Sequence, residues 1–111
     1  MKSKIIVKNR FITACLDLNE ILYVAKELRK VIVYTDEKQY WEYCVMERIL
    51  DQADERIYRC HHSLAVNMDK IHEITGDGVI LCDERELNMC RSALQGTKKA
   101  WGKYLEIGRH R

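Results

Sequence analysis

The sequence contains no proline, only five glycines and no apolar run approaching the roughly 18 residues that a membrane span needs. It also lacks low-complexity stretches, internal repeats and any segment with the composition of a linker. These absences argue against a transmembrane helix and against a division into domains, and 111 residues suit one domain of ordinary size. Residues 1–7 combine basic side chains with a short apolar patch and no cleavage site, so we expect no signal peptide and a cytoplasmic protein.

Paired cysteines are also missing. The five cysteines are widely spaced and include no Cys-x-x-Cys motif, which gives little support to a zinc site or a dithiol couple. In a reducing cytosol we expect most of these thiols to behave as small buried apolar side chains. The alternative is a redox-sensing role for Cys60 or Cys90.

The sequence has no large excess of charge of either sign, since its formal net charge is +2. The basic and acidic side chains are nevertheless unevenly distributed along it. Residues 1–30 carry seven basic and three acidic side chains, and residues 92–111 carry five basic and one acidic. Residues 31–58 reverse this balance, with three basic and seven acidic. Such a distribution suits a protein with one face toward an anion and another toward solvent or a protein partner.

Short β-strands dominate the first half of the chain. The β-branched and aromatic content predicts strands over residues 3–9, 11–16, 21–25, 30–35 and 39–43. The nearly continuous apolar run at 21–25 is typical of a strand buried on both faces. Residues 45–53 then recur at helical spacing and predict an amphipathic helix of about ten residues, which must pack on a sheet to bury its single apolar stripe.

The second half continues this pattern. A strand begins near Arg56, and Asn67 can cap a turn over residues 68–70. Residues 72–82 predict a hairpin in which Gly76 and Gly78 supply the positive φ angles of the turn, with one more short strand at 87–89. From Ala93 onward an apolar side at helical spacing predicts a C-terminal helix, with residues 108–111 frayed. Trp41 and Trp101 fit core or half-buried positions, and of the two we favour the core for both.

We expect polar and basic turns between these strands, at residues 26–30, 59–63 and 90–92. If the strands run up and down, these segments gather on one edge of the domain. Loops on a rigid β scaffold are common binding elements, and Arg, Lys, His and Ser side chains suit phosphates and base edges.

The sequence supports a catalytic site or a metal site less well than a binding surface. Cys60 beside His61 resembles a nucleophile and its base, but neighbouring residues on a strand point to opposite faces. The spacing of Cys60, His61, His62 and His72 fits no standard zinc finger. We therefore expect no enzymatic activity, no cofactor and no metal ion.

One segment carries a family resemblance: Ile57-Tyr58-Arg59-Cys60-His61-His62-Ser63-Leu64-Ala65-Val66-Asn67. It is similar to the Phe-x-Arg-x-His-Arg-Ser-x-x-Val-Asn motif of the LytTR family, the DNA-binding domains usually fused behind receiver domains in bacterial response regulators. The strand Ile21-Leu22-Tyr23-Val24 and the segment Met89-Cys90-Arg91-Ser92 fall where the family has corresponding elements. The resemblance covers roughly residues 3–105, within a domain taken as 1–107.

The resemblance implies a mostly β fold, with minor α content, built as an elongated stack of three small antiparallel sheets that grips two successive major grooves with loops. It places DNA-binding side chains at Lys26, Arg29, Lys30, His62, Ser63, Arg91 and Ser92. Arg59, His61 and Asn67 are expected to support the central loop. The implied partners are double-stranded DNA, a second copy on direct repeats and a receiver domain in a full-length protein; without one, the chain reads as an excised or stand-alone regulator.

Two positions depart from the family pattern. His62 stands where the family often has Arg or Asn, and a neutral imidazole still offers one donor and one acceptor. Ser92 replaces the second terminal arginine and removes a long donor. The alternative function is therefore a protein-interaction domain of the same fold that uses residues 31–58 and has lost specific DNA binding.

Overall fold

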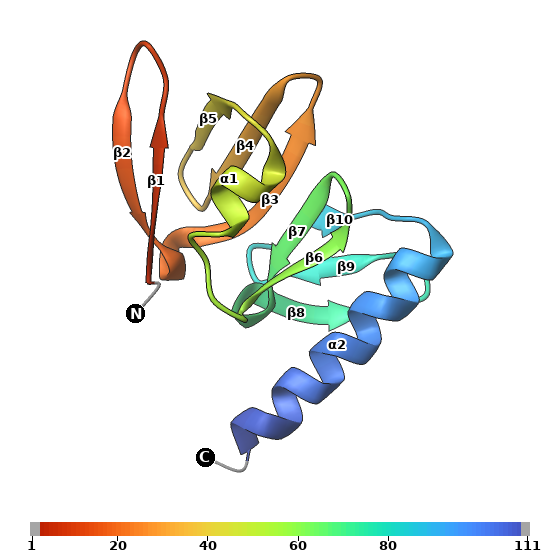
Figure 1. Cartoon of the computed structure of the whole chain (residues 1–111). Coiled ribbons are helices and arrows are strands. Elements are labelled where there is room, and N and C mark those ends of the chain that lie inside the picture. The colour runs from red at the N-terminus through yellow and green to blue at the C-terminus, as the bar shows by residue number, and fades with distance from the viewer. Residues whose placement is uncertain (1–2, 110–111) are drawn as a thin grey trace.

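The computed structural model describes residues 3–109, with side chains described to residue 108. It contains ten strands, two α-helices and two 3₁₀ turns within that range (Figure 1). In chain order the elements are β1 (Lys4–Lys8), β2 (Thr13–Asp17), η1 (Leu18–Glu20), β3 (Ile21–Glu27), β4 (Lys30–Thr35), β5 (Gln39–Tyr43), α1 (Met46–Leu50), β6 (Ile57–His61), β7 (Leu64–Asn67), η2 (Met68–Lys70), β8 (Ile71–Ile74), β9 (Val79–Leu81), β10 (Glu86–Leu87) and α2 (Arg91–Arg109).

The strands form three antiparallel sheets, as the family resemblance implies. The first pairs β1 with β2, the second has the order β5-β4-β3-β7-β6, and the third has the order β10-β9-β8. The chain measures 40 × 32 × 24 Å along its principal axes. The described part of the chain has no helix that is both long and apolar enough to cross a membrane.

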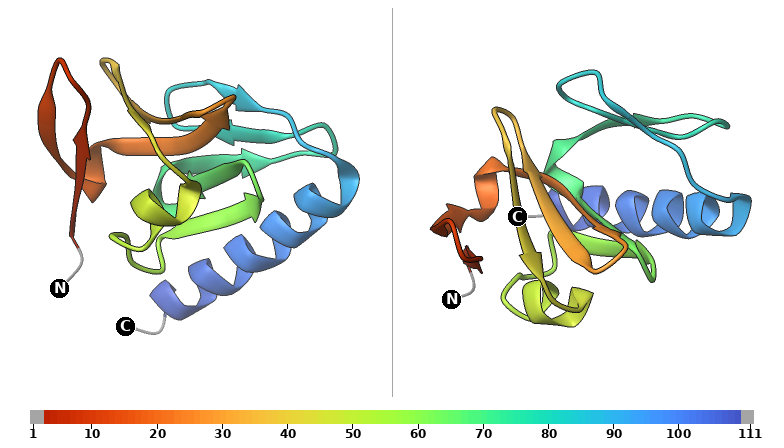
Figure 2. Two further views of the ribbon diagram at one scale, coloured as in Figure 1. Left: turned by 45° about the horizontal axis from the view of Figure 1, so that its top comes forward. Right: turned by 90° about the horizontal axis from the view of Figure 1, so that it is seen from above.

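The five-stranded sheet lies between two apolar clusters, one on each face. One cluster joins β1, β2 and α1 to one face of the sheet, and it includes Val24 of β3 and Val31 of β4. The other joins the three-stranded sheet and α2 to the opposite face, and it includes Leu22 of β3. The prediction that residues 21–25 are covered on both sides is thus confirmed (Figures 1 and 2).

Helix α1 is shorter than predicted. It spans Met46–Leu50, with Met46 and Ile49 buried, instead of residues 45–53. After Leu50 the amides of Gln52 and Ala53 donate to carbonyls three residues back rather than four, so the backbone tightens into a turn.

The glycine interpretation of the β8–β9 hairpin is wrong, although the hairpin itself forms. No described glycine has a positive φ; Leu28 and Glu84 do, at 58° and 72°. The Thr75 hydroxyl shapes this turn instead, by accepting from the amides of residues 77 and 78. Gly78 is required for a different reason: a Cβ there would lie 2.7 Å from the Leu87 carbonyl oxygen.

Burial also corrects two expectations about side chains. Cys60 is the one buried cysteine, whereas Cys15, Cys82 and Cys90 are exposed, so most of the thiols are not core residues. Trp41 and Trp101 are half-buried rather than central. Helix α2 includes residues 108 and 109, and residues 110 and 111 of the predicted frayed end lie outside the described part.

Candidate nucleic-acid interface

The first candidate segment is the β3–β4 turn. Glu27 pairs with Lys30, which leaves Leu28 and Arg29 as a two-residue connection. Leu28 takes a positive φ of 58° at the first of these positions, a conformation that costs a non-glycine residue about 1–2 kcal/mol. Its side chain is 96% exposed, and Arg29 is exposed beside it. The turn therefore holds an apolar and a cationic side chain in solvent, on strands whose register is fixed.

Lys30 does not share the direction of this turn. Its ammonium nitrogen lies 4.5 Å from the centre of the Trp41 ring and 5.9 Å from that of Tyr43. The side chain thus reaches across the sheet toward β5, where the two rings attract its charge. Lys26 instead lines a shallow hollow beside the turn, together with Leu28, Arg29, Tyr43 and Cys44.

The second candidate segment is the β6–β7 turn, which carries His62 and Ser63. The Arg59 guanidinium donates to the His62 carbonyl oxygen at 2.6 Å and to the Glu47 carboxylate at 2.8 Å. Arg59 lowers the pKa of Glu47 through this hydrogen bond. Arg59 therefore ties the backbone of the turn to α1 and leaves the His62 side chain exposed.

His61 and Asn67 also make contacts to the backbone. The His61 Nδ1 accepts from the Ser63 amide at 3.2 Å, and the Ser63 hydroxyl lies at the same distance. Asn67 is fully buried at the other end of β7. Its amide nitrogen donates to the carbonyls of Leu18 and Ile21, at 3.0 and 2.8 Å, and its side-chain oxygen accepts from the Asp69 amide.

The first two segments lie side by side. Ala25 of β3 pairs with Leu64 of β7, and the Lys26 amide donates to the Ser63 carbonyl at 2.9 Å. The side chains predicted to meet DNA from these two turns therefore belong to one end of the five-stranded sheet.

The third candidate segment is the start of α2, not a turn as the sequence analysis expected. Arg91 and Ser92 occupy the first turn of this 19-residue helix, and both are exposed. The Ser92 hydroxyl lies 3.5 Å from the Cys90 sulfur, and this contact, with the Ala93 amide, lowers the pKa of the Cys90 thiol. In all three views the start of α2 lies on the same side of the molecule as the β3–β4 and β6–β7 turns (Figures 1 and 2).

Comparison with known proteins identifies the family and the fold. The family model described as the LytTr DNA-binding domain matches residues 13–102. The chain belongs to the LytTR DNA-binding domain family. A solved structure with the same fold is the LytTr DNA-binding domain of a Bacillus cereus protein described as a methyl-accepting/DNA response regulator, with a TM-score of 0.76, 17% identity, and coverage of 92% of this chain and 99% of that chain. A search of curated proteins finds no match.

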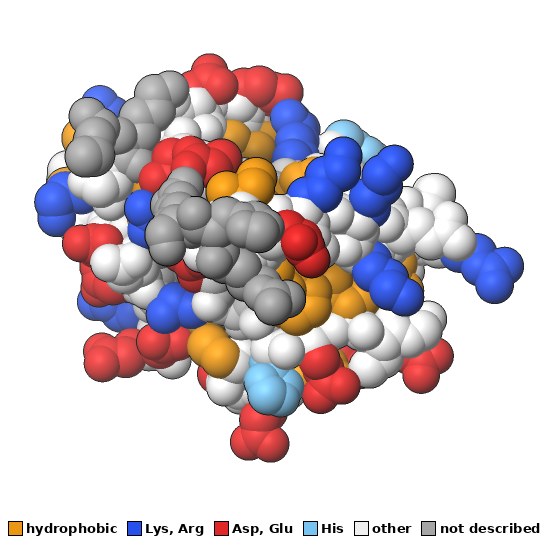
Figure 3. All heavy atoms as spheres, turned by 90° about the horizontal axis from the view of Figure 1, so that it is seen from below, with side chains coloured by type: hydrophobic (Ala, Val, Ile, Leu, Met, Phe, Trp, Pro, Cys, Tyr) orange, Lys and Arg blue, Asp and Glu red, His pale blue; other side chains and the backbone are white. Residues whose placement is uncertain are grey.

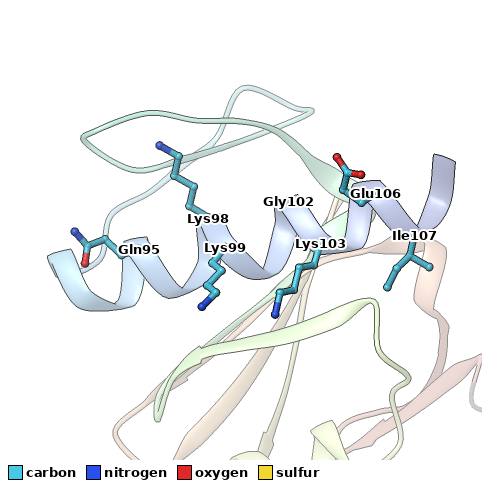
Figure 4. Close-up of a pocket in the computed structure, with 7 residues that line it drawn as sticks. All are labelled: Gln95, Lys98, Lys99, Gly102, Lys103, Glu106 and Ile107. Atoms are coloured by element: carbon cyan, nitrogen blue, oxygen red, sulfur yellow. The ribbon is translucent and has the colours of Figure 1, made fainter. Parts of the chain in front are cut away.

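This LytTR domain also has a basic surface that the sequence analysis did not select. Lys98, Lys99 and Lys103 line a shallow hollow along the exposed side of α2, and Figure 4 shows Lys99 and Lys103 extending to the same side of the helix. Seen from below, basic side chains gather over this part of the molecule (Figure 3). The spacing of four residues between Lys99 and Lys103 is the signal that could have identified it.

The fold separates Cys60 from His61, the two residues considered as a catalytic pair. Cys60 lies in the apolar cluster between the sheet and α2, and burial raises the pKa of its thiol. His61 instead bonds to Ser63 in the turn. Within the described residues no group of three or more His, Cys, Asp or Glu side chains could hold a metal ion.

Proposed function

We propose that this LytTR domain binds double-stranded DNA in a sequence-specific manner, as the output domain of a bacterial transcriptional regulator. The observation that carries the proposal is the position of three exposed segments, the β3–β4 turn, the β6–β7 turn and the start of α2, on one side of the molecule. The longest dimension of the chain is 40 Å. One turn of B-DNA is about 34–36 Å long, so a domain of this length can enter successive major grooves.

The three segments supply different chemistry. Lys26 and Arg29 offer positive charge to phosphates, which position a protein on the duplex without reading sequence. The exposed His62 imidazole suits a base edge, and Arg91 suits the bidentate acceptors of guanine. Ser63 and Ser92 add short hydroxyl groups at the margins of these contacts.

Support from Arg59 and His61 matters for His62. A side chain that reads a base must be held in place before binding, because immobilising it on binding costs about 0.5–1.5 kcal/mol. The bond from Arg59 to the His62 carbonyl fixes the backbone of this turn in the free protein. Arg59 thus acts as a positioning residue in the proposal. In the β3–β4 turn we favour Arg29 over Lys30 as the DNA contact, because the Lys30 side chain lies over the Trp41 ring.

The basic face of α2 extends the positive surface away from Arg91 and would raise the local concentration of a polyanion.

Two further partners belong to the proposal. We expect two copies to bind direct repeats, and a receiver domain to be attached in a full-length regulator.

Binding-site selection from a random duplex library tests the function, followed by affinity measurements on the selected site at several salt concentrations. Arg29→Ala should weaken binding to all sequences and reduce the slope of log K against log salt by about 0.9, the value of one phosphate contact. His62→Ala should instead reduce discrimination at one base pair by about 1–3 kcal/mol. Lys38→Ala, an exposed lysine at the opposite end of β4, is the matched control.

The outcomes separate the two candidate functions. Selection of a defined site with these variant effects supports the proposal. No detectable binding at low salt contradicts it and favours the protein-interaction alternative. If His62→Ala weakens all sequences equally, His62 is not a base-reading residue.

A further inference from the structure

The β1–β2 turn is fixed against the edge of the five-stranded sheet. The Asn9 side chain donates to the Trp41 carbonyl oxygen at 2.7 Å and accepts from the Phe11 amide at 2.8 Å. A two-stranded hairpin is marginally stable alone, so the bond to Trp41 of β5 gives the turn a definite position, and the bond to Phe11 fixes its shape. Arg10 and Phe11 are consequently presented on a rigid support.

Aromatic rings and cations alternate across this part of the surface. The Phe11 and Trp41 rings are 6.4 Å apart and the Trp41 and Tyr43 rings are 5.1 Å apart, both edge to face. The Arg10 guanidinium lies 5.0 Å from the Phe11 ring centre, and the Lys30 ammonium lies 4.5 Å from that of Trp41. We refer to these five residues as the aromatic ledge.

The ledge is accessible to a partner. Phe11 is 71% exposed and Tyr43 is 65% exposed, although both rings are held by neighbours. Exposed rings in fixed positions contribute little to the core. They do offer a flat apolar surface at small cost in conformational freedom, which is useful for binding.

The charge of the ledge selects an anionic partner. The hollow beside Trp41 is lined by Lys8, Asn9, Arg10, Trp41, Glu42 and Tyr43. Its one acidic residue, Glu42, is 8% exposed, and its carboxylate accepts from the Arg48 side chain and the Lys8 amide. The outward charge of the surface is therefore positive.

The ledge is continuous with the first proposed DNA-contacting turn. Tyr43 lines the hollow beside Trp41 and also the hollow that contains Lys26 and Arg29. In Figure 1 the β1–β2 and β3–β4 turns lie at the same end of the molecule, with β5 between them. An anion bound at Arg29 that extends along this end must cross the ledge.

We propose that duplex DNA flanking the recognised bases lies on the aromatic ledge, with Arg10 at a phosphate and the Phe11 and Tyr43 rings against deoxyribose. This inference depends on the proposed function and extends the DNA footprint beyond the three segments to β5 and the β1–β2 turn. A duplex backbone alternates charged phosphates with sugars, which matches a surface of alternating cations and rings. The contact carries no sequence information and serves affinity and orientation.

Duplex length provides the test. Affinities of the unsubstituted protein, Arg10→Ala, Phe11→Ala and Lys38→Ala are measured on the selected site alone and on the same site extended by about one helical turn, roughly 10 base pairs, on each side. The Lys38 ammonium also rests over a ring, 5.1 Å from the Tyr40 centre, but it follows the far end of β4, so Lys38→Ala is the matched control.

We expect the extension to strengthen binding by the unsubstituted protein and by Lys38→Ala, and both ledge variants to lose this gain. On the long duplex the slope of log K against log salt should be smaller by about 0.9 for Arg10→Ala. When salt rises from about 50 to about 200 mM, the factor by which affinity falls should therefore be about threefold smaller for Arg10→Ala than for the unsubstituted protein. On the short duplex both ledge variants should match the unsubstituted protein. Unchanged thermal unfolding confirms that these exposed substitutions leave the fold intact.

The failures are distinguishable. If the unsubstituted protein binds the short duplex and Arg10→Ala has the same affinity as the unsubstituted protein for both duplexes, the ledge does not contact DNA. The proposed function still stands in that case. That result would assign the ledge to a protein partner instead. If the unsubstituted protein binds neither duplex, both proposals are overturned.

Discussion

Removal of the Asn67 side-chain amide should strongly destabilise this domain. The amide nitrogen donates to two backbone carbonyls, those of Leu18 and Ile21, and the side-chain oxygen accepts from the Asp69 amide. A neutral hydrogen bond contributes about 1 kcal/mol net, and a buried group left without its partner costs about 1–3 kcal/mol. Asn67→Ala should therefore lower the free energy of unfolding by about 3–4 kcal/mol, a fall in Tm of about 12–16 °C at about 4 °C per kcal/mol.

Asn67→Asp gives the sharper test because it changes only the donor. An ionised carboxylate would face two carbonyl oxygens in the core, so its protonated form is favoured in the folded state and its pKa is raised there. Stability of this variant is then lost as pH rises, and urea unfolding should show it closer to the unsubstituted protein at about pH 5 than at about pH 8. Asn88→Ala, at an exposed asparagine, should change stability by less than about 0.5 kcal/mol. An Asp variant with no extra pH dependence would refute the two bonds to carbonyls.

Three further substitutions test other contacts. Gly78→Ala should lower the free energy of unfolding in urea by about 1–3 kcal/mol because its Cβ meets a backbone oxygen of β10, whereas Gly76→Ala, with open space and no positive φ, should raise it by about 0.4–1 kcal/mol. Burial and the hydrogen bond to Asp69 raise the pKa of Tyr104 to about 12. The unfolded chain therefore releases the phenol proton at lower pH than the folded protein, and the free energy of unfolding falls as pH rises from about 10. Tyr104→Phe should show a smaller fall in the free energy of unfolding over this pH range. Cys90 is exposed with a lowered thiol pKa, so Cys90→Ser should remove the fastest phase of reaction with a disulfide reagent at neutral pH.

Local pattern was sufficient for most of the strands. The β-branched and aromatic content of residues 30–35 predicted β4 with its observed bounds, and the apolar run at 21–25 predicted a strand covered on both sides. These features depend on residue type and on runs of apolar side chains, which a sequence shows directly. The Asn67 cap was predictable for a similar reason, because it acts on a backbone amide two residues away.

Features that depend on distant neighbours were not predictable. The direction of Lys30 is decided by Trp41, which reaches it through the pairing of β4 with β5. The partner of Arg59 in α1 is Glu47, and no local pattern joins the two. Positive φ was expected at glycines, yet it occurs at Leu28 and Glu84, where hairpin geometry overrides residue preference.

The candidate site shows the same division. The sequence identified the three segments, and the structure shows that the third is the beginning of a helix. The aromatic ledge was missed because Phe11, Trp41 and Tyr43 come from two separate segments and meet only where the β1–β2 turn packs on β5.

The position of the five-stranded sheet between two apolar clusters has a consequence for how the chain can be divided. Each cluster uses the opposite side of the same middle strands, so removing either end of the polypeptide uncovers residues that the remaining part cannot bury. A fragment ending before β8 would keep β3 but expose Leu22 and Val66 to water. Split versions of this domain should therefore recover structure only when both pieces are mixed, and neither piece should stay monodisperse by itself.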